Sequence, residues 1–253
     1  MDTKIFLLMP LAFACEFIDS SLGMGYGTTL APLLLLMGFE PLQVVPAILF
    51  SEFVSGITAA FFHHSLKNVN FHPSSKDFKV AAVLSLFAVV GVVVAVLVAI
   101  KLPPIVLKIF IGSIVITMGV VIFATFNRSP RFTWRKIAIL GTIASFNKGM
   151  SGGGYGPLVM GGQLLSGIGV KNAVGITSFS EGVTCLVGII LYITFKPEID
   201  WSLAPWLMAG AVLSVPFAAH TVKRIPEKKI KVIIAIVVIV LGGLTLYKAL
   251  ASA

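Results

Sequence analysis

Five charged residues lie inside long apolar runs of this sequence, and their side chains are the ones best suited to chemistry. They are four acids and one base, namely Glu16, Asp19, Glu52, Glu181 and Lys148. Each would cost at least about 2.5 kcal/mol if it faced lipid. We therefore expect them to face a protein interior or a water-filled cavity, where such groups bind ions, carry protons or pair with one another.

The apolar runs around these charges are long enough to cross a membrane. Residues 80–100, 105–126 and 230–246 are nearly free of charge, and about 20 apolar residues span a ~30 Å hydrocarbon core. Of the 253 residues, 57% are hydrophobic and 11% are charged, whereas soluble domains carry about 25% charged residues. The sequence predicts an all-α polytopic membrane protein with one domain over residues 1–253.

The sequence also repeats itself. Residues 17–56 align without a gap on residues 146–185, an offset of 129 (146 − 17), and 13 of these 40 positions are identical. A Gly-x-Gly-Tyr-Gly motif occurs at 23–27 and again at 152–156, and Phe-Ser-Glu occurs at 50–52 and 179–181. Chance pairing of apolar stretches does not produce such matches in one alignment. We divide the chain into repeat 1 (4–126) and repeat 2 (134–249).

Each repeat has the same predicted order of elements. A short apolar segment (4–18 and 134–146) leads into a glycine-rich break (19–27 and 147–156), because closely spaced glycines disfavour a helix by about 1 kcal/mol each. A second short segment follows (28–38 and 157–167). Three long helices then complete each repeat, at 42–62, 78–100 and 104–126, and at 171–195, 201–221 and 227–249.

The basic residues distinguish two ways of placing these repeats in a membrane. If the breaks form re-entrant hairpins, the halves are inverted, and the 19 Lys and Arg residues divide 13 to 5 between the two faces, with Lys148 inside the membrane. If each break lies within one spanning helix, the halves are parallel and the division is 10 to 8. Because cytoplasmic loops are rich in Lys and Arg, we predict inverted repeats with both termini in the periplasm.

The two glycine-rich breaks are the predicted substrate site. Paired broken segments at corresponding positions commonly mark the binding site of a transporter. The second short segments are expected to begin at Thr28 and Pro157, so two helix N-termini would offer free N–H groups to an anion. Tight helix packing by small residues is the alternative interpretation. The candidate substrate-binding residues are Ser21, Gly23, Gly25, Tyr26, Gly27, Asn147, Lys148, Ser151, Gly152, Gly153, Gly154 and Tyr155, with Thr177 and Ser178 as weaker candidates.

Two pairs of charges occupy equivalent positions in the repeats. Asp19 and Lys148 correspond (148 − 19 = 129) and have opposite sign, so they could form a structural ion pair; alternatively, Lys148 holds an anion while Asp19 exchanges a proton. Glu52 and Glu181 also correspond. A buried carboxyl group can carry a proton across a barrier, or it can brace the backbone of the break. We expect Glu52, Glu181 and Asp19 to be the proton-coupling residues.

Other classes of function lack support in the sequence. No nucleotide-binding motif or nucleophile–base arrangement is present, which argues against ATP-driven transport and against an enzyme. We expect no cofactor and no metal centre, and we interpret Cys15 and Cys185 as packing thiols. The formal charge of +9 is spread over short loops, so it predicts orientation in the lipid bilayer rather than binding to nucleic acid. A homodimer is plausible for such a small carrier.

The paired glycine motifs resemble those of the sulfite exporter TauE/SafE family, also called the TSUP membrane transporters. The resemblance is carried by Phe-Ile-Asp-Ser-Ser-Leu-Gly-Met-Gly-Tyr-Gly at 17–27 and by Gly-Gly-Gly-Tyr-Gly-Pro at 152–157. It implies a transporter in the bacterial inner membrane for anions such as sulfite, thiosulfate or an organosulfonate. It places the glycine breaks at the transport path, and it assigns no role to Lys148 or to the glutamates.

Two functions remain open at this point. The first is proton-coupled transport of a small anion, with alternating access around a site at the membrane midplane that contains Lys148. The second is exchange of a cation for protons, with Glu52 and Glu181 as cation ligands. A lysine at the centre of the site would repel a cation, which favours the anion.

Overall fold

The structure is a computed structural model that describes residues 3–124, 133–164, 166–222 and 227–251. The described residues contain helices and turns and no strand, in agreement with the predicted fold class. The helices are α1 (Thr3–Leu22), α2 (Tyr26–Leu36), α3 (Pro41–Ser65), α4 (Lys76–Ala99), α5 (Pro104–Ala124), α6 (Trp134–Ser151), α7 (Tyr155–Leu164), α8 (Val170–Phe195), α9 (Ala204–Thr221) and α10 (Glu227–Ala251).

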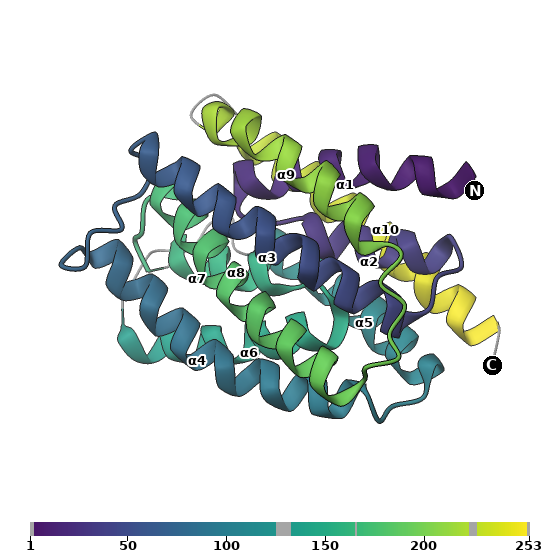
Figure 1. The fold of residues 1–253 in the computed structure, drawn as a ribbon. Helices are drawn as coiled ribbons and strands as arrows, with labels where there is room; N and C mark the ends of the chain where they lie inside the picture. The colour runs from purple at the N-terminus through teal and green to yellow at the C-terminus, as the bar shows by residue number, and fades with distance from the viewer. Residues whose placement is uncertain (1–2, 125–132, 165, 223–226, 252–253) are drawn as a thin grey trace.

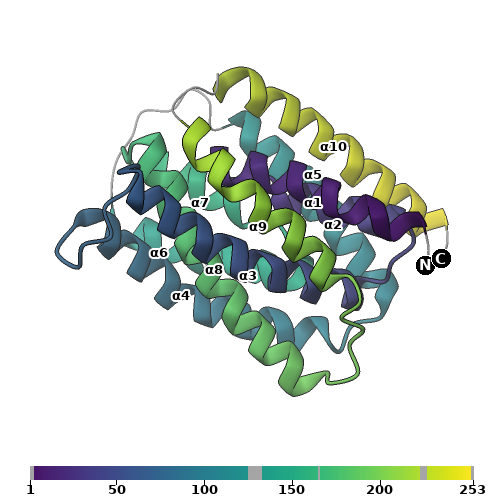
Figure 2. The same cartoon turned by 45° about the horizontal axis from the view of Figure 1, so that its top comes forward.

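Helices α1–α5 and α6–α10 occupy the two predicted repeats in the same order. In this order α1, α3 and α4 are equivalent to α6, α8 and α9. Helix α1 packs along α9 and the equivalent α6 packs along α4; likewise, α3 contacts α9 and the equivalent α8 contacts α4. Helices α3 and α8 also pack against each other, as do α5 and α10. Figures 1 and 2 show that α3 and α8 run in opposite directions and that the first turn of α1 and the last turn of α10 lie at the same end of the bundle.

Four of the described helices are long and apolar enough to cross a bilayer, namely residues 41–65, 76–99, 104–121 and 170–195. Six long spans were predicted. Helix α9 does not meet the same requirements, and residues 239–251 of α10 count as a shorter apolar helix. Residues 125–126 of the predicted span 104–126 lie outside the described residues. Large apolar side chains such as Leu86 and Phe217 are about two-thirds exposed, which suits a surface that faces lipid.

Local sequence features explain several helix boundaries. Helix α3 begins at Pro41, whose missing N–H is tolerated in the first turn of a helix. At the start of α4, the Ser75 hydroxyl accepts a hydrogen bond from the backbone N–H of Phe78 (3.1 Å), as expected of an N-terminal cap. At the crossings of α4 with α6 and of α1 with α9, a Cβ atom on Gly91 or on Gly210 would overlap the backbone of the opposing helix. These crossings therefore require glycine.

The helix breaks are shorter than predicted. Helix α1 continues to Leu22 and α6 continues to Ser151, so only residues 23–25 and 152–154 are non-helical. The predicted breaks at 19–27 and 147–156 were too long, because the intervening polar residues fit the last turn of each first helix. Gly23 and Gly152 have the same left-handed φ of 73°, which ends an α-helix at little cost for glycine only. The second helices begin at Tyr26 and Tyr155 rather than at Thr28 and Pro157.

Candidate functional site

Lys148 lies at the centre of the bundle between two glutamates. Its ammonium group donates a hydrogen bond to Glu52 Oε2 and another, 2.7 Å long, to Glu181 Oε1. The Lys148 side chain is fully buried, and both glutamates are at most 5% exposed. Glu52 comes from the middle of α3 and Glu181 from the middle of α8, so Lys148 in the last turn of α6 ties together three helices of the bundle.

This arrangement differs from the ion pair between Asp19 and Lys148 that was one of the two interpretations left open by the sequence. Within the described residues, both ion pairs of Lys148 are made with the equivalent glutamates rather than with Asp19. The Asp19 carboxylate instead accepts a hydrogen bond from the backbone N–H of Tyr26 (3.1 Å), the first residue of α2. The equivalence of positions 19 and 148 placed both residues beside the breaks, but it contained no information about the direction of their side chains.

Asp19 therefore acts as an internal anion at the start of α2. A helix N-terminus offers unpaired N–H groups and a partial positive charge, and a carboxylate there satisfies both. One of the two N-termini predicted to hold an external anion is already occupied. In the second half the equivalent position is Lys148, which has no carboxylate to offer to the start of α7.

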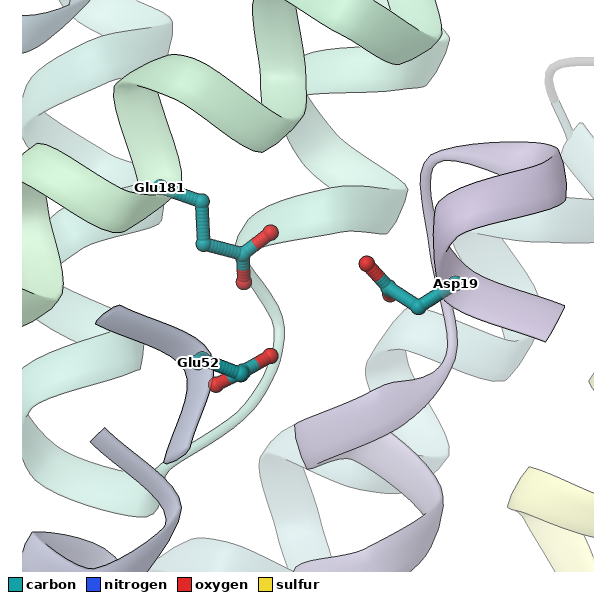
Figure 3. Close-up of side chains that lie close together, drawn as sticks. All are labelled: Asp19, Glu52 and Glu181. Atoms are coloured by element: carbon teal, nitrogen blue, oxygen red, sulfur yellow. The ribbon is translucent and has the colours of Figure 1, made fainter. Parts of the chain in front are cut away.

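Three carboxyl groups converge beside the lysine. Oxygen atoms of Asp19, Glu52 and Glu181 all lie within 4.8 Å of one another, and Figure 3 shows the three side chains pointing toward one another from α1, α3 and α8. They line a cavity of about 10 Å³ together with Glu16, Ser55, Gly56 and Ser178. A space of this size holds about one water molecule, so a polyatomic anion requires the site to open.

Two side chains that line the cavity, those of Glu16 and Ser55, were not among the predicted substrate-binding or proton-coupling residues, and neither was Gly56. Glu16 accepts a hydrogen bond from the Ser20 hydroxyl (2.6 Å) through one carboxylate oxygen, while its other oxygen, the Ser55 hydroxyl and Glu52 Oε1 are buried without a hydrogen-bond partner. Helical spacing could have found both. Glu16 lies three residues before Asp19 and Ser55 lies three residues after Glu52, so each pair shares one face of its helix.

The charges of this cluster do not balance if every group is ionised. Four carboxylates, from Glu16, Asp19, Glu52 and Glu181, would face the single ammonium group of Lys148, which leaves a net charge of −3 (1 − 4) in a buried space. An uncompensated charge of this size in a membrane interior is prohibitively costly. The cluster must therefore hold protons or a cation in its resting state.

The two breaks contact each other backbone to backbone. A Cβ atom on Gly27 would overlap the Gly152 carbonyl group, and one on the equivalent Gly156 would lie 2.6 Å from the carbonyl oxygen of Gly23. The Thr28 hydroxyl accepts a hydrogen bond from the backbone N–H of Gly154 (3.2 Å), which joins the two breaks directly. The structure thus brings both predicted glycine motifs to one place.

The two motif tyrosines point into the neighbouring long helices. The Tyr26 hydroxyl forms a 2.6 Å hydrogen bond with the Ser51 hydroxyl. The equivalent Tyr155 hydroxyl lies close to Ser180, the equivalent of Ser51, and to Thr184. Both tyrosines are fully buried. The Tyr26 bond joins the start of α2 to α3, which carries Glu52, whereas the Tyr155 hydroxyl is buried without a hydrogen-bond partner among the described residues.

The remaining predicted residues are buried near the breaks and bond locally. The Ser151 hydroxyl donates to the backbone oxygen of Asn147 (2.7 Å), and the Ser21 hydroxyl lies 3.5 Å from that of Thr221. Thr177 accepts a hydrogen bond from the Gln163 side chain (2.8 Å), which places Thr177 outside the charge cluster. Ser178 lines the central cavity. Cys15 and Cys185 are buried free thiols, as predicted.

Comparisons with known proteins agree with the resemblance found at the glycine motifs. Residues 8–245 match the family described as Sulfite exporter TauE/SafE. The chain is also similar to the probable membrane transporter protein YtnM of Bacillus subtilis (strain 168), with 25% identity over 256 residues that cover 96% of this chain and 83% of that protein. Together with the long apolar helices, the match over nearly the whole chain shows that this multi-pass membrane protein belongs to the sulfite exporter TauE/SafE family of membrane transporters.

Proposed function

We propose that the protein is a proton-coupled secondary transporter of a small sulfur-containing anion, such as sulfite, thiosulfate or an organosulfonate, across the bacterial inner membrane. The family description names sulfite export, and the glycine breaks and charge cluster supply a site at the centre of the bundle. The observation that carries the proposal is the difference between the two halves at positions 19 and 148.

In the first half, the Asp19 carboxylate binds the backbone N–H at the start of α2. In the second half, a lysine occupies the equivalent position, so no carboxylate from that position binds the start of α7. A substrate anion bound at the start of α7 would accept a hydrogen bond from the backbone N–H there, as the Asp19 carboxylate does at α2. The Lys148 ammonium group would be its counter-charge. The candidate residues that precede α7 along the chain are Asn147, Ser151 and the glycines at 152–154.

The glutamates supply the coupling to protons. When Glu52 and Glu181 are ionised they occupy the ammonium group of Lys148, and together with Asp19 they repel an anion. Protonation of the glutamates removes that repulsion and releases Lys148 to the substrate. The anion and the protons therefore bind together, and by linkage each increases the affinity for the other.

The arrangement of the halves supports alternating access. The helix contacts of the two repeats correspond, and α3 and α8 run in opposite directions, as inverted repeats require (Figure 1). In this proposal α1–α2 and α6–α7 are re-entrant hairpins that enter the membrane from opposite sides. The two termini lie in the periplasm, where the 13-to-5 division of basic residues puts the lysine-poor face.

Exchange of a cation for protons is the alternative function. It is favoured by the three carboxyl groups within 4.8 Å of one another, because oxygen ligands of this kind suit hard cations. The ammonium group of Lys148, bonded to two of these three acids, opposes a further positive charge at the same place. We therefore favour the anion.

Flux measurements in proteoliposomes test these functions against each other. Purified protein is reconstituted and supplied with labelled sulfite, thiosulfate, a sulfonate or a divalent cation, with and without a pH gradient. We expect uptake of at least one of the anions, driven by an inwardly directed proton gradient. Uptake of the cation without flux of any of the anions would overturn the proposal.

The pH dependence of anion binding is a further expected result. Lowering the pH should increase the affinity for the anion, because protons bound by the charge cluster release Lys148 to the substrate. In the Glu52→Gln/Glu181→Gln variant this increase should be largely lost, since the amides cannot take up a proton. Binding of the labelled anion to detergent-solubilised protein measures both. An affinity that is equally pH-dependent in the variant would assign the protons to other groups.

A further inference from the structure

A second repeated feature lies at the ends of the helices that carry the glutamates. The His63 ring nitrogen Nε2 lies 2.9 Å from the backbone oxygen of Ser20. The Tyr192 hydroxyl donates a hydrogen bond to the backbone oxygen of Gly149 (2.9 Å). At the repeat offset of 129, His63 is equivalent to Tyr192 (192 − 63) and Ser20 is equivalent to Gly149 (149 − 20). Two different side chains therefore make the same connection in the two halves.

The helix breaks create the need for this connection. The last regular bonds of the first helices run from Gly23 N–H to the Asp19 oxygen (2.6 Å) and from Gly152 N–H to the Lys148 oxygen (2.8 Å). The next carbonyl groups, on Ser20 and Gly149, lose their regular donors at the breaks, and a buried carbonyl without a donor is costly. His63 and Tyr192 supply the missing donors.

The donor and acceptor roles of His63 follow from its surroundings. Nε2 faces a carbonyl oxygen and must donate, so Nδ1 is the acceptor and takes a hydrogen bond from the Asn68 side chain (3.1 Å). The same Asn68 amide donates to the backbone oxygen of Ala219 in α9 (3.1 Å). His63 thus connects the end of α1 to α3 and, through Asn68, to α9.

These two connections lie at opposite ends of the bundle. His63 is in the last turn of α3, and Tyr192 is in the last turn of α8. Because α3 and α8 run in opposite directions (Figures 1 and 2), their last turns are far apart. Each connection holds the backbone directly after Asp19 or Lys148, the equivalent residues of opposite charge. We call the His63–Ser20 and Tyr192–Gly149 hydrogen bonds the two latches.

We infer that His63 and Tyr192 are positioning residues, and that each latch keeps one side of the transporter closed. The inference rests on the alternating access proposed above. In the present structure both latches are formed and the central cavity, of about 10 Å³, is too small for a polyatomic anion. Opening toward the end of α3 releases the His63 latch, and opening toward the end of α8 releases the Tyr192 latch.

Site-specific cysteine labelling tests this inference without a substrate. Reporter cysteines replace Ser21 and Met150, which are equivalent residues beside the two latches and are at most 3% exposed. A membrane-impermeant maleimide is added to whole cells or to inverted vesicles. Labelling at each reporter is quantified by mass spectrometry, so that the natural Cys15 and Cys185 can remain in place.

The two latch variants should have opposite effects. His63→Leu should increase the labelling rate of the Ser21→Cys reporter from the cytoplasmic side by about tenfold, as expected for loss of one buried hydrogen bond, and should decrease labelling of Met150→Cys. Tyr192→Phe, which removes only a hydroxyl, should do the reverse from the periplasmic side. His63→Gln, which keeps a donor and an acceptor, should restore most of the original rates.

Matched controls separate a latch from a general loss of packing. Tyr247→Phe on the exposed surface of α10 and His72→Leu in the loop before α4 remove the same groups elsewhere and should leave both rates unchanged. An increase at both reporters in either latch variant would mean a loosened fold and would overturn the inference, as would unchanged rates.

The outcome can be separated from a failure of the proposed function. If the two latch variants shift the labelling rates in opposite directions but the protein transports none of the tested anions, the latch inference stands. Only the proposed substrates are then excluded. Labelling of both reporters from one side of the membrane would contradict the inverted arrangement itself, and with it both proposals.

Discussion

Replacement of Lys148 by methionine is expected to abolish anion transport and to destabilise the protein by about 3–5 kcal/mol. Methionine fills much of the same space but leaves the Glu52 and Glu181 carboxyl groups buried without the ammonium group that both now bind. The glutamates must then take up protons, and the anion loses its counter-charge. Flux in proteoliposomes and thermal unfolding in detergent measure the two effects.

Two further variants separate the structural part of this effect from the functional part. The Lys148→Met/Glu52→Gln/Glu181→Gln variant has no buried charge left at the three positions, so most of the stability should return while transport stays absent. Lys196→Met removes an ammonium group from an exposed ion pair with Glu198, where the hydrogen bond from Lys196 lowers the pKa of the Glu198 carboxyl group. It should change neither property, since exposed pairs contribute little. A Lys148→Met protein with normal flux would show that the substrate does not use this lysine.

Replacement of Gly27 by alanine is expected to prevent formation of the native bundle. The added Cβ would overlap the Gly152 carbonyl group, and because that group belongs to the other break and not to a flexible side chain, the two breaks must separate. Overpacking in a core usually lowers the stability of the fold by about 1–3 kcal/mol. A clash with a fixed backbone is expected to cost at least the upper end of this range. The yield of monodisperse protein after membrane extraction measures the effect.

Gly243→Ala is the matched control for this substitution. Gly243 lies within α10, and an added Cβ there meets no atom within 4 Å. This variant should be obtained in normal yield, because alanine favours a helix over glycine. Equal yields for the two variants would contradict the close contact between the breaks.

Most of the helices could be predicted from the sequence, because each carries a long apolar run that ends at turn residues. The offset of 129 found both breaks and the Glu52–Glu181 pair, since equivalent residues in a repeat occupy equivalent places. The same reasoning gave helix starts at Thr28 and Pro157 that were two residues late. Tyr26 and Tyr155 begin these helices because Gly25 and Gly154 already adopt positive φ values of 136° and 79°, a backbone choice that is not visible from helix propensity.

The pairing of the buried charges could not be predicted in this way. Residues 19 and 148 are equivalent, but their side chains leave the backbone at a helix end, where a small rotation decides between the neighbouring helix N-terminus and the glutamates. Asp19 is short and accepts a hydrogen bond seven residues along its own chain, whereas Lys148 reaches α3 and α8. Chain length and hydrogen-bonding capacity, rather than position in the repeat, determined the partners.

The backbone contact between the two glycine breaks has a consequence for the ancestry of the chain. Gly27 of the first half meets residues 152–153, and Gly156 of the second half meets residues 23–24, so each half contributes both surfaces of one junction. This reciprocity is characteristic of an interface between identical subunits related by a two-fold axis. A five-helix polypeptide of half this length would carry everything needed to meet a copy of itself in the same way. A symmetric dimer could not, however, place an acid at one copy of residue 19 and a base at the other, so the difference between Asp19 and Lys148 requires two distinct halves.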